Sequence, residues 1–287
     1  MYKTPLMSIR KPFRAANSGS KTPPDKFRFF QAARHNHVGA VREFVETWDD
    51  AVTWRQSDKT ALLIACEHGS FMSVQVLLQH GAKPAESQGV AGTTPMHAAA
   101  REDRPDVLGL LLHHRAPVDV PGENKNTPLM EAVYRDSRKT AEALLKRGAS
   151  VEKKNAQGDA ALHIAAERGY PLCVALLLDH GADMNAPNEN GLTPLMLAAD
   201  NGCLEAARML LARGCDHHIK NAEGKTALDL GLAHGDSDPA FVEGFRELIN
   251  ARNRKDAQTM GIPFTEGTER SVKVRKPIRL RRRHPHP

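Results

Sequence analysis

The stretch T-P-L-M-L-A-A-D-N-G at residues 193–202 decides the fold, because related stretches recur along the chain at a nearly constant interval. The intervals between successive copies are 34, 33, 33, 33 and 33 residues. A fixed period in this range predicts a stacked solenoid, in which each unit contacts only its neighbours. We therefore look first for a surface that holds a partner. The other copies are T-A-L-L-I-A-C-E-H-G at Thr60, T-P-M-H-A-A-A-R-E-D at Thr94, T-P-L-M-E-A-V-Y-R-D at Thr127, A-A-L-H-I-A-A-E-R-G at Ala160 and T-A-L-D-L-G-L-A-H-G at Thr226.

The unit around this stretch predicts two short helices bounded by turns. The preceding sequence N-E-N-G has the composition of a turn, and its last residue, Gly191, can adopt a positive φ. Thr193 can cap the free N–H groups of a helix start, and Pro194 is tolerated at the first helical position. We expect a short apolar helix that ends at Gly202, and a second helix, with apolar residues at helical spacing, that ends at Gly214.

Three motifs of this unit resemble the ankyrin repeat, namely T-P-L at Thr193, A-A-x-x-G at Ala198 and L-L-x-x-G at Leu210. Six units match, over residues 55–235. The resemblance implies an all-α repeat solenoid, in which helix-turn-helix units are joined by β-turn or hairpin loops. Residues 30–47 keep the apolar spacing without the turn motif and resemble a divergent first unit. We expect caps with polar outer faces at both ends, because the end of a stack would otherwise expose apolar surface.

The repeats divide the chain into one array with two tails. We expect a basic disordered segment at residues 1–28, the ankyrin repeat array at 29–250, and a linker with a basic disordered tail at 251–287. The units of the array are expected near residues 29–54, 55–88, 89–121, 122–154, 155–187, 188–220 and 221–250.

Hydropathy bears on the location of the protein. No apolar run approaches the roughly 18 residues that a membrane span needs. The residues after Met1 also lack the apolar core of a secretory signal. We expect an intracellular monomer in the cytoplasm, or in the nucleus if the organism is a eukaryote. An organellar transit peptide at the basic start is the alternative.

The net charge of +6 hides a segregation of charge along the chain. Residues 1–28 carry seven Lys or Arg and one Asp, and residues 269–287 carry eight Lys or Arg and one Glu, which leaves the remainder with a net charge of −7. The array therefore lacks the positive footprint of a folded nucleic-acid-binding surface. The C-terminal tail is either a solubilising disordered segment or an electrostatic tether to nucleic acid, anionic lipid or an acidic partner. Its cations are Lys273, Arg275, Lys276, Arg279, Arg281, Arg282 and Arg283.

Four residues that could suggest chemistry fit the repeat pattern instead. His97 and His163 occupy the fourth position of the T-P-L-H pattern, where the resemblance implies structural hydrogen bonds between the turns of neighbouring units. Cys66 replaces the second Ala of the A-A motif, and Cys173 falls on the apolar face of a second helix. We predict that both cysteines are small core residues.

Two further clusters also have a structural interpretation. Cys215, His217 and His218 lie near a turn, but no fourth ligand is spaced for a metal ion. Residues 224–226, G-K-T, match the end of a phosphate loop, yet Ile219 stands where its first Gly belongs. The chain contains no H-E-x-x-H, G-x-S-x-G or dinucleotide fingerprint. We therefore expect no enzyme, and no catalytic, cofactor-binding or metal-binding residue.

The resemblance implies that a partner binds the concave face, which is lined by turn tips and by the exposed positions that end each first helix. Tyr134 and Arg135 are the strongest candidates, because large aromatic and Arg side chains dominate interface energies. Beside them, Lys125, Asp103 and Asp136 replace glycines of the pattern, which marks either a part specialised for binding or drift. The candidates are Arg101, Glu102, Asn126, Tyr134, Arg135, Asp159, Glu167, Arg168, Leu192, Asp200 and Asn201, and the same positions also include Lys59, Glu67, His68 and Thr93.

These patterns predict a non-enzymatic scaffold or adaptor that binds a protein partner on the concave face. Two alternatives stay open. The first is a regulator that docks to nucleic acid or an anionic membrane through its tails. The second is a secreted bacterial effector that acts in a host cell.

Overall fold

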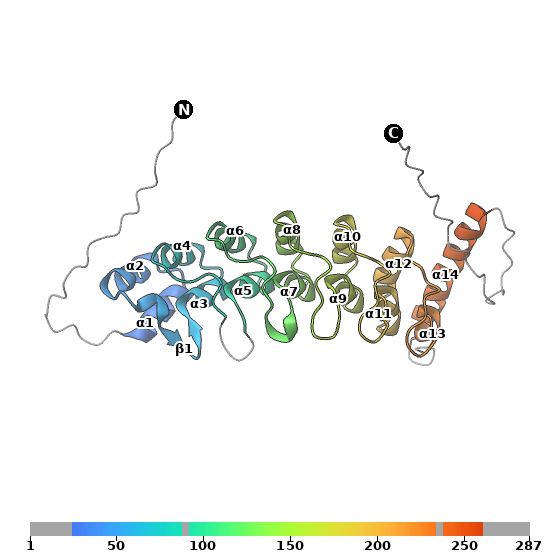
Figure 1. Ribbon diagram of the computed structural model, residues 1–287, viewed down its shortest axis with the longest axis horizontal. Coiled ribbons are helices and arrows are strands. Elements are labelled where there is room, and N and C mark those ends of the chain that lie inside the picture. The colour runs from blue at the N-terminus through green and yellow to red at the C-terminus, as the bar shows by residue number, and fades with distance from the viewer. Residues whose placement is uncertain (1–24, 88–91, 234–237, 261–287) are drawn as a thin grey trace, which may run out of the picture.

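The helices stack in pairs along a single row, with the first helix of every pair on one side and the second helix on the other (Figure 1). This arrangement, a computed structural model that describes residues 25–87, 92–233 and 238–260, confirms the solenoid predicted from the repeat period. The first helices are α1 (Lys26–Arg34), α3 (Ala61–Glu67), α5 (Pro95–Arg101), α7 (Pro128–Tyr134), α9 (Ala161–Glu167), α11 (Pro194–Asp200) and α13 (Ala227–Leu232).

The second helices bury one face against the first helices and expose the other. In α8, for example, Ala141, Leu144 and Leu145 are buried while Glu142 and Lys146 are exposed. This division follows from apolar residues at helical spacing. The second helices are α2 (Val38–Thr47), α4 (Phe71–Gln79), α6 (Pro105–His113), α8 (Arg138–Lys146), α10 (Pro171–Asp179), α12 (Leu204–Arg213) and α14 (Pro239–Met260).

Helix α11 begins and ends where local chemistry predicts. The Oγ1 atom of Thr193 accepts a hydrogen bond from the N–H of Met196 at 3.4 Å, and Pro194 is the first helical residue. Gly202 has a φ of 67° directly after the helix, in the left-handed region that Gly adopts at little cost. The cap and the stop signal are therefore confirmed at this unit.

The turn tips project from the first-helix side of the row (Figure 1). One tip is a hairpin of β1 (Arg55–Gln56) and β2 (Lys59–Thr60), which pair antiparallel. Its two turn residues, Ser57 and Asp58, have φ values of 51° and 63°, as a turn that matches the twist of a two-residue hairpin requires. Two short 3-10 helices, η1 (Ala51–Thr53) and η2 (Glu123–Lys125), complete the regular elements of the described residues.

The five inner first helices, α3, α5, α7, α9 and α11, are buried almost over their whole length. In α3, residues Ala61 to Cys66 are all buried, and the six residues from Pro194 to Ala199 are buried in α11. The side chains of Cys66 and Cys173 have no exposed surface, which confirms both as core residues. Because only the end of each of these five helices reaches solvent, the sequence positions open to a partner on this side are few.

The buried His97 ties neighbouring units together, as the T-P-L-H pattern predicts. In His97, Nδ1 accepts a hydrogen bond from the N–H of Thr94, and Nε2 lies 3.1 Å from the carbonyl oxygen of Asn126 in the next unit. Nε2 of His163 lies 2.9 Å from the carbonyl oxygen of Ala186, at the end of its own unit, and Nδ1 accepts a hydrogen bond from the N–H of Ala160. Both rings therefore need Nδ1 free of a proton, which is the neutral form.

We expect these histidines to make stability depend on pH. Burial is the main cause that lowers the pKa of both His97 and His163 in the folded protein. As the pH falls through about 6.5, the unfolded chain binds protons that the folded chain does not, so stability is lost towards pH 5. The double variant His97→Gln/His163→Gln should be less stable at pH 7 but should lose less stability on acidification. Urea denaturation at several pH values checks this, and an unchanged pH slope would contradict it.

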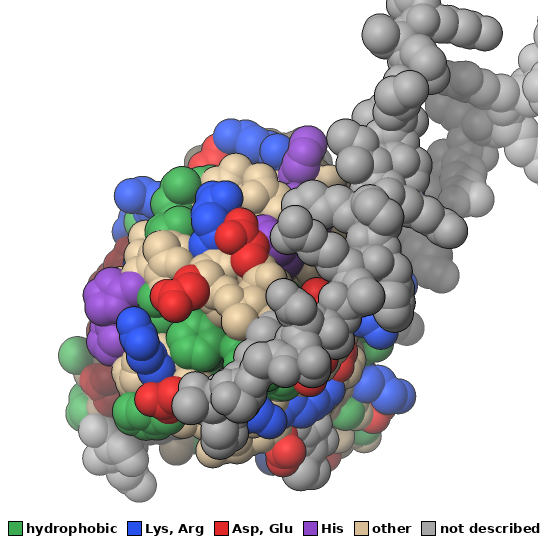
Figure 2. All heavy atoms as spheres, turned by 90° about the vertical axis from the view of Figure 1, so that its left-hand side faces the viewer, with side chains coloured by type: hydrophobic (Ala, Val, Ile, Leu, Met, Phe, Trp, Pro, Cys, Tyr) green, Lys and Arg blue, Asp and Glu red, His purple; other side chains and the backbone are tan. Residues whose placement is uncertain are grey.

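The N-terminal end of the stack has the polar outer face of a cap. Helix α1 begins at Lys26, inside the segment 1–28 that we expected to be disordered. On α2, the side chains of Arg42, Glu43 and Glu46 are exposed. Figure 2 shows charged and His side chains spread over this end, with apolar side chains between them.

The last helix, α14, is longer than the sequence analysis predicts. It runs to ten residues past residue 250, where we expected the array to end, and extends beyond the row of second helices (Figure 1). Nε2 of His217 lies 2.7 Å from Oδ1 of Asn253, which ties the extension to the preceding unit. A salt bridge of 3.1 Å between Arg252 and Asp256, one turn apart, further supports the helix.

Candidate interaction surface

Two rows of exposed or partly exposed residues run along the array where the first helices end. We call these rows, with the turn tips beside them, the first-helix face. It collects most of the residues that the sequence marks as candidates for partner binding. The last residues of the first helices form one row, Glu67, Arg101, Tyr134, Glu167 and Asp200, and the residues after them form the other, His68, Glu102, Arg135, Arg168 and Asn201.

Tyr134 is at the centre of this face. Its side chain is 41% exposed, which makes it one of four large apolar or aromatic residues exposed in the described structure. The guanidinium carbon of Arg168, from the next unit, lies 3.8 Å from the centroid of the Tyr134 ring. This cation–π contact orients both side chains at the surface. Arg135 follows Tyr134 directly and is exposed.

Arg101 is committed to a contact within the array. Its Nε atom lies 3.1 Å from Oε2 of Glu131, whose side chain is almost buried, and Nδ2 of Asn126 lies 3.2 Å from Oε1 of the same carboxylate. A buried carboxylate needs such partners, since an unpaired charge in the interior is costly. Glu131 is not among the residues predicted from the sequence, although an acid inside an otherwise apolar first helix is a signal for such a contact.

Three other candidates also serve the array. The Nδ2 atom of Asn188 donates to Oδ1 of Asp159 at 2.8 Å, and that of Asn155 donates to Oδ1 of Asn126 at 3.3 Å. These bonds link the turn tips of neighbouring units. Leu192 is half-buried against the core. The exposed part of the predicted site is therefore smaller than the sequence suggests, and partner binding at it stays a prediction.

Residues that replace the closing Gly of a first helix bind the next unit. Asp103 has a φ of 49°, and its Oδ1 accepts hydrogen bonds from the N–H of Thr140 at 3.2 Å and from the hydroxyl of Thr140 at 2.8 Å. Asp136, with a φ of 53°, accepts a hydrogen bond of 3.2 Å from the thiol of Cys173. We call these contacts inter-repeat clasps. They give the two Asp residues a structural role that the interpretation as a binding mark had not included.

A third clasp shows that the pairing follows a rule. Asn36, with a φ of 56°, accepts a hydrogen bond of 2.9 Å from the N–H of Ser73. The partner is in each case the third residue of the next second helix. Thr140 and Cys173 donate from their side chains, whereas Ser73 donates from its backbone N–H. Where the closing residue is Gly, the corresponding position is apolar, as in the pairs Gly69 with Val107 and Gly169 with Ala206.

The surroundings of the cysteines favour structure over nucleophilic chemistry. Burial raises the pKa of Cys173 and of Cys215 to about 12, so both remain protonated thiols at neutral pH. In the described ranges, no group of three His, Cys, Asp or Glu side chains is placed to hold a metal ion. Nor is any helix of those ranges both long and apolar enough to cross a membrane.

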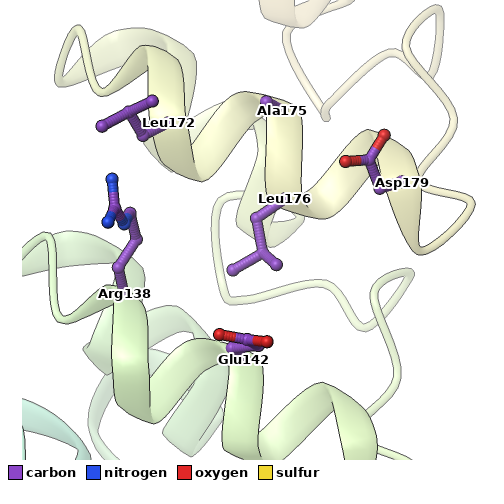
Figure 3. A pocket seen from close by; sticks show the side chains of 6 residues that line it. All are labelled: Arg138, Glu142, Leu172, Ala175, Leu176 and Asp179. Carbon is purple, nitrogen blue, oxygen red and sulfur yellow. The ribbon is translucent and has the colours of Figure 1, made fainter.

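A shallow groove lies between α8 and α10 on the opposite side of the array. It has a volume of about 280 Å³ and is lined by residues from these two helices only. Leu172 and Leu176 face Arg138 and Glu142 across it (Figure 3). The Lys146 ammonium, hydrogen-bonded to Glu142, lowers the pKa of that carboxyl, and the other acid of the groove, Asp179, is paired with Arg213 at 2.7 Å. The groove therefore presents no unpaired acid for catalysis.

The tail cations lie outside the described residues. This holds for Lys273, Arg275, Lys276, Arg279, Arg281, Arg282 and Arg283. Their binding to nucleic acid or to an anionic surface stays a prediction.

Comparison with known families decides the identity of the array. The family model of ankyrin repeats, in three copies, matches residues 85–155, 129–221 and 162–252. The chain belongs to the ankyrin repeat family. Ankyrin repeat domains generally mediate protein–protein interactions, and the fold is typical of a non-enzymatic module.

Solved ankyrin repeat structures agree with this assignment. The ankyrin repeat domain of Bcl-3, described as a unique member of the IkappaB family, is 26% identical, with a TM-score of 0.66, and the match covers 76% of this chain and 97% of that domain. The human ASB11 ankyrin repeat domain is 24% identical, with a TM-score of 0.67, and the match covers 79% of this chain and 98% of that domain, which shows the shared fold alone. No curated protein sequence matches the chain significantly.

Proposed function

We propose that this ankyrin repeat protein is a non-enzymatic scaffold or adaptor that holds a protein partner on its first-helix face. The observation that carries the proposal is the exposed Tyr134 ring, oriented by Arg168 and flanked by Arg135. Aromatic and Arg side chains that are already ordered lose little conformational freedom on binding, which favours them as centres of binding energy.

The supporting geometry is rigid. Helix α7 ends at Tyr134 and Arg168 directly follows α9, and each helix is buried along its length apart from its exposed end. Below them, the contact of Arg101 with Glu131 and the bond of His97 to Asn126 fix the spacing of neighbouring units. A partner would therefore meet a preformed surface. The four free cysteines are consistent with a reducing compartment, which is part of the proposal.

Partner capture with matched variants tests the proposal. The full-length protein is used to capture partners, which are identified by mass spectrometry and purified for affinity measurements. The double variant Tyr134→Ala/Arg135→Ala should weaken partner binding about tenfold or more, because truncation of a central aromatic or Arg commonly costs over 1 kcal/mol. Its helical content by circular dichroism should be unchanged, since both side chains are exposed.

Leu172→Ala is the matched control. Leu172 is 54% exposed, more than Tyr134, but lies in the groove on the opposite side of the array. This variant should retain the affinity of the unaltered protein. If Leu172→Ala weakened binding and Tyr134→Ala/Arg135→Ala did not, the partner would bind the second helices and the proposal would be wrong.

A further inference from the structure

Three cations of the first-helix face are each paired with a nearby acid. Nζ of Lys59 lies 2.7 Å from a carboxylate oxygen of Glu67, and Nε of Arg101 lies 3.1 Å from Glu131. Near the other end, Lys225 pairs with Glu223 at 2.9 Å. Cations with a partner of their own have little electrostatic attraction left for a ligand.

Arg135 and Arg168 differ from these cations. Within the described ranges, neither guanidinium has an acidic partner or makes a side-chain hydrogen bond. Arg168 lies over the face of the Tyr134 ring, at 3.8 Å from its centroid. The N–H donors of a guanidinium lie in its plane, so a contact through the face leaves them available for a bidentate bond to an oxyanion.

We propose that Tyr134, Arg135 and Arg168 form a binding patch for an acidic segment of a protein partner. Carboxylates of the segment accept charge-assisted hydrogen bonds from the two guanidinium groups, and its apolar atoms pack on the exposed Tyr134 ring. This inference rests on the proposed function, because it names the kind of partner that the first-helix face would hold.

The surrounding charges select this occupant over two others. The exposed acids Glu102 and Glu167 stand next to the patch in the same two rows, so the positive region is confined to one place. Nucleic acid requires a more extended positive surface. The tails of this chain, at residues 1–28 and 269–287, carry net charges of +6 and +7 and are therefore repelled by the patch. A short acidic peptide segment needs only a small positive region, and its negative charge is attracted to the patch.

Two short peptides probe the patch, one of alternating Glu and Ser and one of alternating Gln and Ser. Binding to the full-length protein is measured at one low ionic strength. The Glu peptide should bind about tenfold more weakly to Arg135→Ala/Arg168→Ala than to the unaltered protein, given the strength of charge-assisted hydrogen bonds. The control Arg147→Ala/Lys153→Ala removes the same charge from exposed positions elsewhere and should bind nearly as the unaltered protein does. The Gln peptide should bind all three weakly.

A residue-specific readout separates the patch from the basic tails. In the variant Arg168→Lys, a carbodiimide can couple the new amine to a carboxylate of the bound Glu peptide, and mass spectrometry locates the link. A link at position 168, and none at position 147 in Arg147→Lys, supports the patch. Equal weakening by both double variants, or links confined to the tails, would overturn it. In that case the loss of the captured partner in Tyr134→Ala/Arg135→Ala would still support the proposed function.

Discussion

Replacement of Gly158 by Ala is expected to destabilise the protein by about 3 kcal/mol, because the change combines backbone strain with a clash between units. Gly158 has a φ of 77° at a turn tip. A Cβ atom built there would lie 2.7 Å from the backbone nitrogen of Glu189 in the next tip. The Glu189 backbone cannot move aside without disturbing its N–H bond to the carbonyl of Gln157, which is 3.4 Å long. Urea denaturation followed by circular dichroism measures the loss.

Gly224 provides the matched control for this prediction. It occupies the same position in a later tip, with a φ of 76°, but a Cβ atom there would meet nothing within 4 Å. Gly224→Ala should therefore cost only the strain of a left-handed Ala, about 1 kcal/mol. The difference between the two variants measures the contact between tips. Equal losses of stability would show that the tips do not support one another.

Asp103→Ala is also expected to cost about 3 kcal/mol, because it removes a cap and places Ala in a left-handed conformation. The N–H and the hydroxyl of Thr140 would both lose their acceptor. Asp103→Asn keeps an acceptor and a tolerance for positive φ, so it should be close to neutral. Asp103→Gly should fall between these two, since it removes the strain but not the unpaired hydroxyl. The free energy of unfolding from urea denaturation ranks the three.

A compensating variant tests whether the clasp explains the ranking. Asp103→Gly/Thr140→Val reproduces the pairing of Gly69 with Val107 found one unit earlier in the same chain. This variant should recover most of the stability that Asp103→Gly loses, because the unpaired hydroxyl of Thr140 is gone. Additive losses from the two substitutions would contradict the coupling.

Local chemistry explains why much of the fold could be predicted from the sequence. The start of α11 at Thr193 and Pro194, and its stop at Gly202, depend on residues within a few positions of one another. The burial of Cys66 and the neighbour contacts of His97 follow from the repeat phase. Five equal or nearly equal intervals extend these local rules over the whole array.

The details of the site depend on how units stack, and could not be predicted by local rules. Arg101 was expected to face a partner, but stacking places it against Glu131, 30 residues away. The clasp of Asp103 reaches Thr140, 37 residues away. A signal for it did exist, since a polar residue at the closing position accompanies a polar third residue in the next second helix. The extension of α14 could not be predicted because the hydrogen bond that holds it, between His217 and Asn253, also joins residues far apart in the sequence.

The clasps also predict how the array responds to a force that pulls its two ends apart. Among the described residues, clasps cross the junctions on both sides of unit 122–154, whereas Gly69 and Gly169 leave the junctions after units 55–88 and 155–187 without one. Since each unit contacts only its neighbours, tension passes through every junction in series. When the two ends are pulled apart, residues 89–187, which carry Tyr134, should stretch less than the junction after unit 55–88, where Gly69 provides no side-chain acceptor. A partner bound at these residues would therefore stay held while the molecule stretches.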